Sequence, residues 1–258
     1  MLPRDRIAAA LRAGGRDGEP ALVAFLTAGY PQRERFREQL AAVAEGADVV
    51  EIGVPFTDPM ADGMTIQRSS REALRQGVSL QWILDELAAM TRPRSPLLLM
   101  SYLNPLLSYG YEKLAAVSVA AGVCGFIVPD LPLDESGLLR TALDAHGLAL
   151  VQMVTPVTPA ARLARLCAAS QGFVYAVTMT GTTGKSVAMP AEALAYLARV
   201  RAAAQVPVCA GFGIRTRQQV DALRGVVDGV IVGSALVEVL ERGESPQAWL
   251  ASLRPAAR

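Results

Sequence analysis

The chain alternates short, continuously apolar segments with amphipathic ones, and this alternation constrains its fold more than any other feature. Apolar segments without polar alternation indicate strands buried on both faces, as in parallel sheets. Eight such segments lie at residues 21–28, 49–52, 97–102, 125–129, 149–154, 172–178, 206–210 and 228–232. Eight strand–helix units in 258 residues predict an α/β fold, a single (β/α)8 TIM barrel domain spanning residues 1–258.

The segments between these strands carry apolar residues at helical spacing. Helices are expected at 1–12, 31–45, 65–76, 80–90, 136–145, 160–169, 191–203, 216–223 and 235–241, with a further turn or two at 246–253. The first is an extra N-terminal helix. The connection after the second strand is elaborated, and such loops on rigid scaffolds tend to carry function. An open doubly wound sheet is the main competitor, but no G-x-G-x-x-G follows the first strand.

Composition excludes several classes of function. The formal net charge of +1 gives no electrostatic reason to expect nucleic acid or an anionic membrane. No apolar run is long enough to span a bilayer, and the N-terminus lacks the apolar core of a signal peptide. Cys124, Cys167 and Cys209 are far apart in apolar surroundings, which indicates reduced thiols in a cytoplasmic protein. His146 is the only histidine, which disfavours a histidine-based triad and most zinc or iron sites, so no metal is expected.

A carboxylate interrupts the second apolar segment, and two more follow on the next loop. Glu51 lies between Val50 and Ile52, where an ionised carboxylate is costly unless it is paired or has a chemical role. Asp58 and Asp62 follow on a loop that contains proline and glycine. Carboxylates on a strand and on the adjoining loop suit general acid–base catalysis from two sides of a substrate. A structural ion pair with ordinary turn aspartates is the alternative.

Glycine-rich turns follow the seventh and eighth predicted strands. Gly211 and Gly213 follow the seventh, while Gly233 and Ser234 follow the eighth and precede a predicted helix. Open backbone N–H groups and the partial positive charge of a helix start favour a bound anion. These two loops form the usual phosphate site of such barrels. The sequence therefore predicts a phosphate site here, with ordinary tight turns as the alternative.

The remaining strand ends bring aromatic and polar side chains to the same rim. They are Phe25, Thr27, Tyr102, Asn104, Asp130, Met153, Thr155 and Tyr175. Tyr102 and Tyr175 can equally be core aromatics with satisfied hydroxyls, and Asp130 a turn residue. The loop at 180–186 contains Gly184-Lys185-Ser186, but Met179 stands where a P-loop needs its first glycine. A mobile lid suits this glycine- and threonine-rich loop better than nucleotide hydrolysis does.

Seven stretches stand out together at these strand ends. They are Glu51–Gly63, Tyr102–Pro105, Ile127–Pro132, Gly172–Tyr175, Gly181–Gly184, Gly211–Ile214 and Gly233-Ser234. In this order and placement, and over nearly the whole chain, the sequence resembles the α subunit of tryptophan synthase.

This resemblance implies a carbon–carbon lyase of L-tryptophan biosynthesis that cleaves indole-3-glycerol phosphate into indole and glyceraldehyde 3-phosphate. It implies that Glu51 and Asp62 are catalytic. The other matching positions are Phe25, Tyr102 and Tyr175 for the indole pocket, Thr183, Gly184, Gly213, Gly233 and Ser234 for substrate and phosphate binding, and Asp58 with Thr183 for loop closure and coupling. It further implies no cofactor in this subunit, a β-subunit partner that carries pyridoxal phosphate, and a cytoplasmic α2β2 heterotetramer.

Two departures from the family pattern bear on the loops. Met64 follows Asp62-Gly63 where the family usually has proline, and Tyr30 stands where aspartate is common. Proline would fix a backbone torsion, so Met64 leaves the loop freer and the coupling to a β subunit open. The alternatives are a stand-alone lyase that releases free indole, a non-catalytic subunit that binds a phosphate ligand, and another phosphate-handling barrel such as an isomerase of the same pathway.

Overall fold

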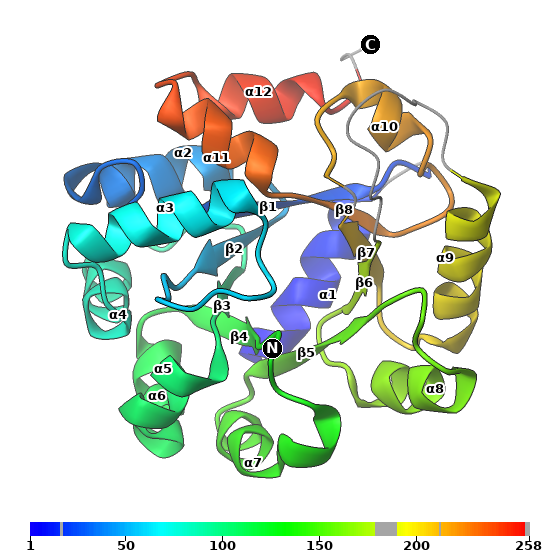
Figure 1. Cartoon of the computed structure of the whole chain (residues 1–258), viewed down its shortest axis with the longest axis horizontal. Helices are drawn as coiled ribbons and strands as arrows, with labels where there is room; N and C mark the ends of the chain where they lie inside the picture. The colour runs from blue at the N-terminus through cyan, green and yellow to red at the C-terminus, as the bar shows by residue number, and fades with distance from the viewer. Residues whose placement is uncertain (16–17, 179–189, 212, 256–258) are drawn as a thin grey trace.

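Eight parallel strands close into a barrel in the computed structural model, which describes residues 1–15, 18–178, 190–211 and 213–255 (Figure 1). The strands are β1 (Ala21–Thr27), β2 (Val49–Gly53), β3 (Leu97–Met100), β4 (Val123–Ile127), β5 (Ala149–Val154), β6 (Val174–Val177), β7 (Val208–Gly211) and β8 (Gly229–Val232). Each strand pairs with its neighbour in sequence, and β8 pairs with β1 through Ala21 and Gly229. The predicted (β/α)8 barrel is therefore confirmed.

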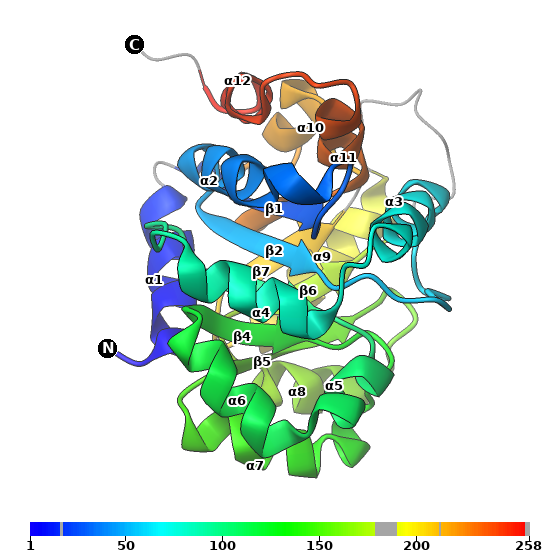
Figure 2. The same cartoon turned by 90° about the vertical axis from the view of Figure 1, so that its left-hand side faces the viewer.

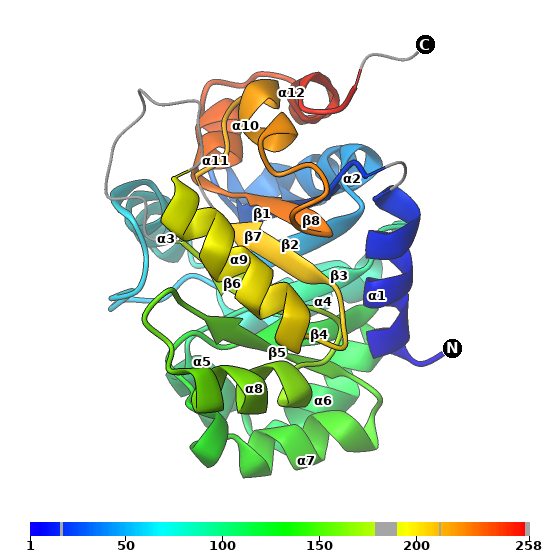
Figure 3. The same ribbon diagram turned by 90° about the vertical axis from the view of Figure 1, so that its right-hand side faces the viewer.

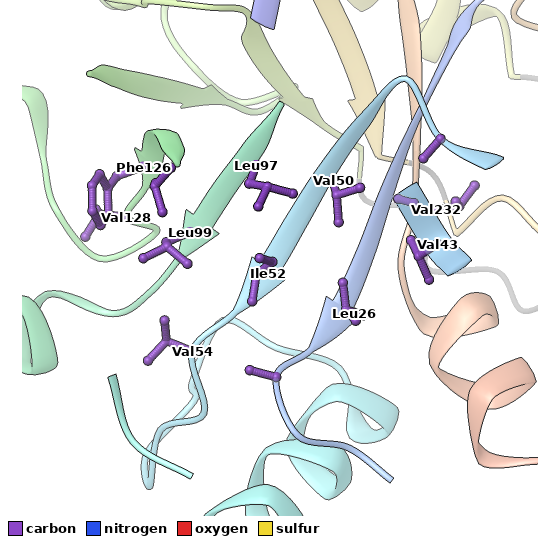
Figure 4. Packing of buried hydrophobic residues seen from close by; sticks show 14 of the residues in the cluster. Leu26, Val43, Val50, Ile52, Val54, Leu97, Leu99, Phe126, Val128 and Val232 are labelled. Carbon is purple, nitrogen blue, oxygen red and sulfur yellow. The ribbon is translucent and has the colours of Figure 1, made fainter. Parts of the chain in front are cut away.

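The strands bury both faces, which explains why their sequences are continuously apolar. Outward-pointing side chains such as Val50 and Ile52 form the layer between the strands and the helices, where Figure 4 shows them beside Leu26, Leu97 and Leu99. The inward-pointing side chains form a second cluster. Side chains alternate along a strand, so both clusters draw on every second residue of the same strands.

The first helix, α1 (Pro3–Gly14), closes the N-terminal end of the barrel. Its Ile7 and Leu11 are fully buried and belong to the inner cluster with Val23 and Val49. Figures 2 and 3 show α1 across the end of the barrel opposite to the one at which the strand arrows point. The helix therefore leaves the C-terminal end of the strands for binding and chemistry, as in other barrels of this class.

The remaining helices cover the outside of the barrel. They are α2 (Phe36–Gly46), α3 (Met64–Arg75), α4 (Leu80–Ala89), α5 (Leu103–Tyr109), α6 (Tyr111–Ala120), α7 (Gly137–Ala145), α8 (Ala160–Ala169), α9 (Ala191–Ala203), α10 (Arg217–Asp221), α11 (Ser234–Glu241) and α12 (Pro246–Ser252), with single 3-10 turns at Arg33–Arg35 and Leu133–Glu135. The extra N-terminal helix and the two helices of the elaborated connection after β2 are confirmed. Most boundaries lie within two residues of their predicted positions.

The third unit differs most from its prediction. Strand β3 ends at Met100 and not at Tyr102, because the chain turns there into α5, which begins immediately after Tyr102. Pro105 lies in the first turn of α5, where its missing N–H costs no helical hydrogen bond. Helices α5 and α6 had no predicted range, and β4 begins two residues earlier than predicted.

Among the described residues, no helix has both the length and the apolar character needed to cross a membrane.

We predict that Met64→Pro stabilises the protein. Met64 is the first residue of α3 and is 85% exposed, and proline is favoured at the first position of a helix. Gly63 before it has φ −73° and ψ 165°, a conformation that a following proline allows. Fewer unfolded conformations should add about 0.4–1 kcal/mol of stability, or roughly 1–4 °C in melting temperature.

Met60→Pro is the matched control in a thermal melt. Met60 is equally exposed, but its backbone N–H donates to the carbonyl of Asp58 at 2.9 Å, and proline removes that donor. Met60→Pro should therefore not stabilise. A melting temperature for Met64→Pro at or below that of the wild type would contradict the prediction that proline at this position stabilises the protein.

Candidate active site

Glu51 lies inside the barrel and is fully buried. Its neighbours Val50 and Ile52 point outward, so Glu51 points inward on the same side as Val49. Neither carboxyl oxygen has a hydrogen-bond partner among the described residues. Burial disfavours the charged form and raises the pKa of Glu51 to about 8. The side chain is therefore mostly protonated at neutral pH and can act as a proton donor.

A tyrosine holds the second carboxyl group in place. The buried Tyr102 hydroxyl accepts a hydrogen bond from the backbone N–H of Ala61 (2.9 Å) and donates one to Asp62 Oδ2 (3.2 Å). The Gln67 amide donates to the Asp62 carbonyl at 2.8 Å. The ring of Phe56 stacks on Tyr102 with centroids 5.1 Å apart. These contacts fix the loop that carries Asp62 against the rim of the barrel.

The environment of Asp62 differs from that of Glu51. Partial burial raises the pKa of Asp62, while the hydrogen bond from Tyr102 favours the ionised form and opposes that rise. Glu51 has no such opposing contact among the described residues. Two carboxyl groups in unlike surroundings can hold different protonation states, which allows one to donate a proton while the other accepts a hydrogen bond.

A small pocket opens beside Asp62. Its lining is mainly apolar and consists of Phe25, Thr27, Gly53, Val54, Asp62, Ile66, Ser70, Met100, Ser101, Tyr102 and Pro129. A few polar groups in an apolar pocket orient a bound molecule. This lining suits a flat apolar ring that presents a hydrogen-bond donor to the Asp62 carboxylate.

Tyr175 on β6 lies near both carboxyl groups. Burial and the negative charges of Glu51 and Asp62 raise the pKa of its hydroxyl well above the usual value, so the hydroxyl stays protonated. A Cβ atom at position 211 would lie 3.0 Å from the Tyr175 hydroxyl oxygen. Gly211 on the neighbouring β7 therefore leaves the room that this tyrosine occupies.

The glycine turn after β8 lies next to this pocket, and the turn after the neighbouring strand β7 lies at the same end of the barrel. Gly213 has φ +64°, which glycine adopts without strain. Its two chain neighbours aside, no atom of the described residues lies within 4 Å of the position of an added Cβ. Ser234 is the first residue of α11, whose first-turn N–H groups have no partner within the helix. A Cβ at Gly233 would lie 3.6 Å from the Cβ of Phe25, a pocket residue. The turns can hold an anion attached to a ring in the pocket.

The sequence-predicted residues divide into three groups. Phe25, Glu51 and Tyr175 lie within strands of the barrel, and Asp62, Tyr102, Gly213, Gly233 and Ser234 lie on the connections that follow strand ends. Asp58 lies on the exposed part of the same loop as Asp62, where its carboxylate accepts a hydrogen bond from the Thr57 hydroxyl. Thr183 and Gly184 lie outside the described residues.

The sequence did not point to several residues that line the pocket, among them Ile66, Ser70 and Met100. Met100 stands two positions after the inward-pointing Leu98, so strict alternation along the strand could have identified it. Ser70 accepts a hydrogen bond from the Phe56 N–H at 3.1 Å, and Ile66 packs beside Phe25. These two depend on how α3 packs over the barrel, which the sequence pattern does not specify.

In the part of the chain that the structure describes, no group of three or more His, Cys, Asp or Glu side chains is arranged to hold a metal ion.

Comparisons with known proteins agree over nearly the full length of the chain. The family model described as "Tryptophan synthase alpha chain" matches residues 11–256. Proteins of that name from Nitratidesulfovibrio vulgaris strain DP4 and Solidesulfovibrio magneticus are 45% and 46% identical, covering 92% and 96% of this chain and 93% and 96% of their own. Tryptophan synthase from M. tuberculosis, in an open form, is similar in structure with a TM-score of 0.87, 34% identity and 96% of each chain covered. The alpha subunit from Legionella pneumophila str. Paris also has a TM-score of 0.87, with 31% identity over 98% of this chain and 97% of its own.

We predict that Glu51→Gln changes how stability depends on pH. Burial raises the pKa of Glu51 from 4.5 to about 8, so the unfolded chain releases this proton at a lower pH than the folded chain does. Wild-type stability contributed by the protonated form is full below about pH 4.5 and is lost as the pH rises to about 8. Glutamine does not titrate, so the stability of the variant relative to wild type should rise by up to about 1.4 kcal/mol per pH unit across that window.

Denaturant unfolding at several pH values from 5 to 8 measures this difference. The exposed Glu34→Gln makes the same chemical change on the surface and serves as the control. A difference between Glu51→Gln and wild type that does not vary with pH would contradict the raised pKa of the buried carboxyl.

Proposed function

Because this chain belongs to the tryptophan synthase alpha chain family, we propose that its catalytic groups are Glu51 and Asp62. The chain is a lyase that cleaves indole-3-glycerol phosphate into indole and glyceraldehyde 3-phosphate, as the α subunit in tryptophan biosynthesis. The observation that carries the assignment of residues is the buried, protonated Glu51, which pairs in register with the pocket residue Phe25, together with the second carboxyl group, Asp62, in the lining of that pocket.

Glu51 supplies and then recovers one proton. Breaking the bond between indole C3 and the glycerol carbon requires a proton on C3, which the neutral Glu51 carboxyl donates. The resulting carboxylate takes the proton of the glycerol hydroxyl, the aldehyde forms, and the electrons of the broken bond restore the aromatic ring. The residue ends the cycle protonated, as it began. Its position on a strand keeps it aligned for both steps.

Asp62 acts on the opposite side of the ring. Protonation of C3 places positive charge on the indole nitrogen, and a carboxylate that accepts the ring N–H stabilises that charge. The contacts of Tyr102 with Ala61 and Asp62 hold the carboxylate in a fixed orientation. Phe25, Tyr102 and Tyr175 pack around the indole ring in this proposal, and the Tyr175 hydroxyl remains a neutral hydrogen-bond donor.

The phosphate of the substrate occupies the turns after β7 and β8. Gly213, Gly233 and Ser234 offer backbone N–H groups and the start of α11 to the dianion. In this proposal, Thr183 and Gly184 complete substrate binding, and Asp58 with Thr183 closes the loops over the bound substrate. These two roles rest on the family match.

We also propose a β-subunit partner at the C-terminal rim. Large apolar side chains are exposed on the connections after β2, β3, β4 and β5: Met60 (91%), Leu107 (57%), Leu138 (78%) and Val157 (84%). Exposed apolar side chains gathered on one face favour a protein interface. The similar M. tuberculosis structures are of tryptophan synthase, which supports a β partner for this chain. In the proposed cytoplasmic α2β2 heterotetramer, pyridoxal phosphate is bound by the β subunit and this subunit needs no cofactor.

Assays with purified chain distinguish this complex from a stand-alone lyase. Indole release from indole-3-glycerol phosphate is measured with and without a β subunit. A low rate that rises strongly on addition of the β subunit supports the complex, and a high rate that the β subunit does not change supports the stand-alone lyase.

We predict that Glu51→Gln folds but loses nearly all cleavage. The change is close to isosteric, and it removes a group of the kind that contributes about 10²–10⁴-fold to rate. In the wild type, kcat/KM should fall as the pH rises through about 8, because the acid form of Glu51 is lost. Retention of more than a tenth of the activity, with circular dichroism confirming the fold, would refute the role of Glu51.

We predict that Ser234→Asp weakens substrate binding by charge repulsion while the fold stays intact, since aspartate is favourable at a helix start. The KM for indole-3-glycerol phosphate should rise by at least about tenfold, which corresponds to roughly 1.4 kcal/mol. Ser245→Asp, at the start of α12, is the matched control and should leave KM unchanged. An unchanged KM in Ser234→Asp would place the phosphate elsewhere.

A further inference from the structure

The proposed active site is assembled from connections that lie far apart in sequence. Asp62 lies just before α3, Gly213 follows β7, and Ser234 begins α11. Helices α3 and α11 pack side by side next to the rim (Figure 1). A substrate anchored at Gly213 and Ser234 reacts only when Asp62 is also in place, so contacts between these connections affect catalysis.

One carboxylate on α11 contacts the other two connections. Glu238 lies one turn after Ser234 on the same helix. Its two oxygens accept hydrogen bonds from both terminal nitrogens of Arg215, at 2.7 and 2.9 Å, and Arg215 lies two residues after Gly213. The same carboxylate accepts a hydrogen bond from the Thr65 hydroxyl at 3.4 Å. Thr65 lies in the first turn of α3, three residues after Asp62.

The geometry of this cluster favours a fixed arrangement. A guanidinium that donates two parallel hydrogen bonds to one carboxylate restrains both side chains more than a single contact does. The Glu238 side chain is 26% exposed, so its pairing is partly shielded from water. The Arg215 guanidinium also holds the pKa of Glu238 below its usual value, so this carboxylate stays ionised at neutral pH.

We infer that Glu238 is a positioning residue that couples the phosphate end of the active site to the loop that carries Asp62. Anion binding at Gly213 and Ser234 restrains the 213–215 turn and the start of α11, and through Glu238 it restrains Thr65 and the start of α3. Part of the binding energy of the phosphate is then used to orient Asp62. This inference rests on the proposed positions of the phosphate and of the catalytic carboxylates.

A second ion pair between the same helices provides a matched control. Glu241 of α11 accepts a hydrogen bond from Arg68 of α3 at 2.6 Å. It joins the two helices about one turn farther along each of them, and Arg68 is not part of the 213–215 turn. Glu241→Gln therefore removes an ion pair between α3 and α11 without removing a contact to the phosphate turn.

Activation by inorganic phosphate tests the coupling. Wild type, Glu238→Gln, Thr65→Val and Glu241→Gln are each assayed for indole release from indole-3-glycerol, which lacks the phosphate, with and without added inorganic phosphate. The phosphate dianion should accelerate the wild type and Glu241→Gln by the same factor. That factor should fall at least about fivefold in Glu238→Gln and should also fall in Thr65→Val. The kcat for indole-3-glycerol phosphate should fall in Glu238→Gln more than in Glu241→Gln.

The outcomes separate this inference from the proposed function. If the wild type does not cleave indole-3-glycerol phosphate, the proposed function itself fails. If it does, but phosphate fails to accelerate cleavage of indole-3-glycerol or accelerates wild type and Glu238→Gln equally, the coupling is refuted. An equal loss of the acceleration factor in Glu238→Gln and Glu241→Gln would also refute it, because general helix packing would then account for the effect.

Discussion

The burial of one carboxyl group inside the barrel is the constraint on which the proposed site depends. Glu51 is fully buried, neither of its oxygens has a hydrogen-bond partner among the described residues, and its pKa rises to about 8. An ionised carboxylate at this position would be costly, so the fold keeps the group protonated at neutral pH. The barrel thereby provides an acid where the substrate needs a proton, and the same burial lowers stability as the pH rises.

The architecture places the pocket at one end of the barrel. Ile7 and Leu11 of α1 close the N-terminal end, so the pocket opens at the C-terminal rim. The rigid strand that carries Glu51 is joined to a loop whose carboxyl group is fixed by Tyr102. A strand and a tethered loop can present two carboxyl groups to one ring in different protonation states.

The repetition of apolar segments predicted the barrel, and the interruption by Glu51 singled out a candidate catalytic group, because both signals are local. The Tyr102–Asp62 hydrogen bond could not be predicted, since it depends on the path of the loop between them and not on spacing. Residues 115–129 form a largely apolar run that joins α6 to β4, so the pattern did not separate that helix from the strand. Ile66 and Ser70 face the pocket only because of the way α3 packs on the barrel.

The protonation state of Glu51 is the property on which the proposed mechanism depends most directly. Carbon-13 NMR of protein labelled at the glutamate side-chain carboxyl carbons can follow this titration, with the resonance assigned by its absence in Glu51→Gln. We predict a midpoint near pH 8. A midpoint near 4.5, the ordinary value for glutamate, would contradict it, because Glu51 would then be ionised at neutral pH and could not donate the first proton.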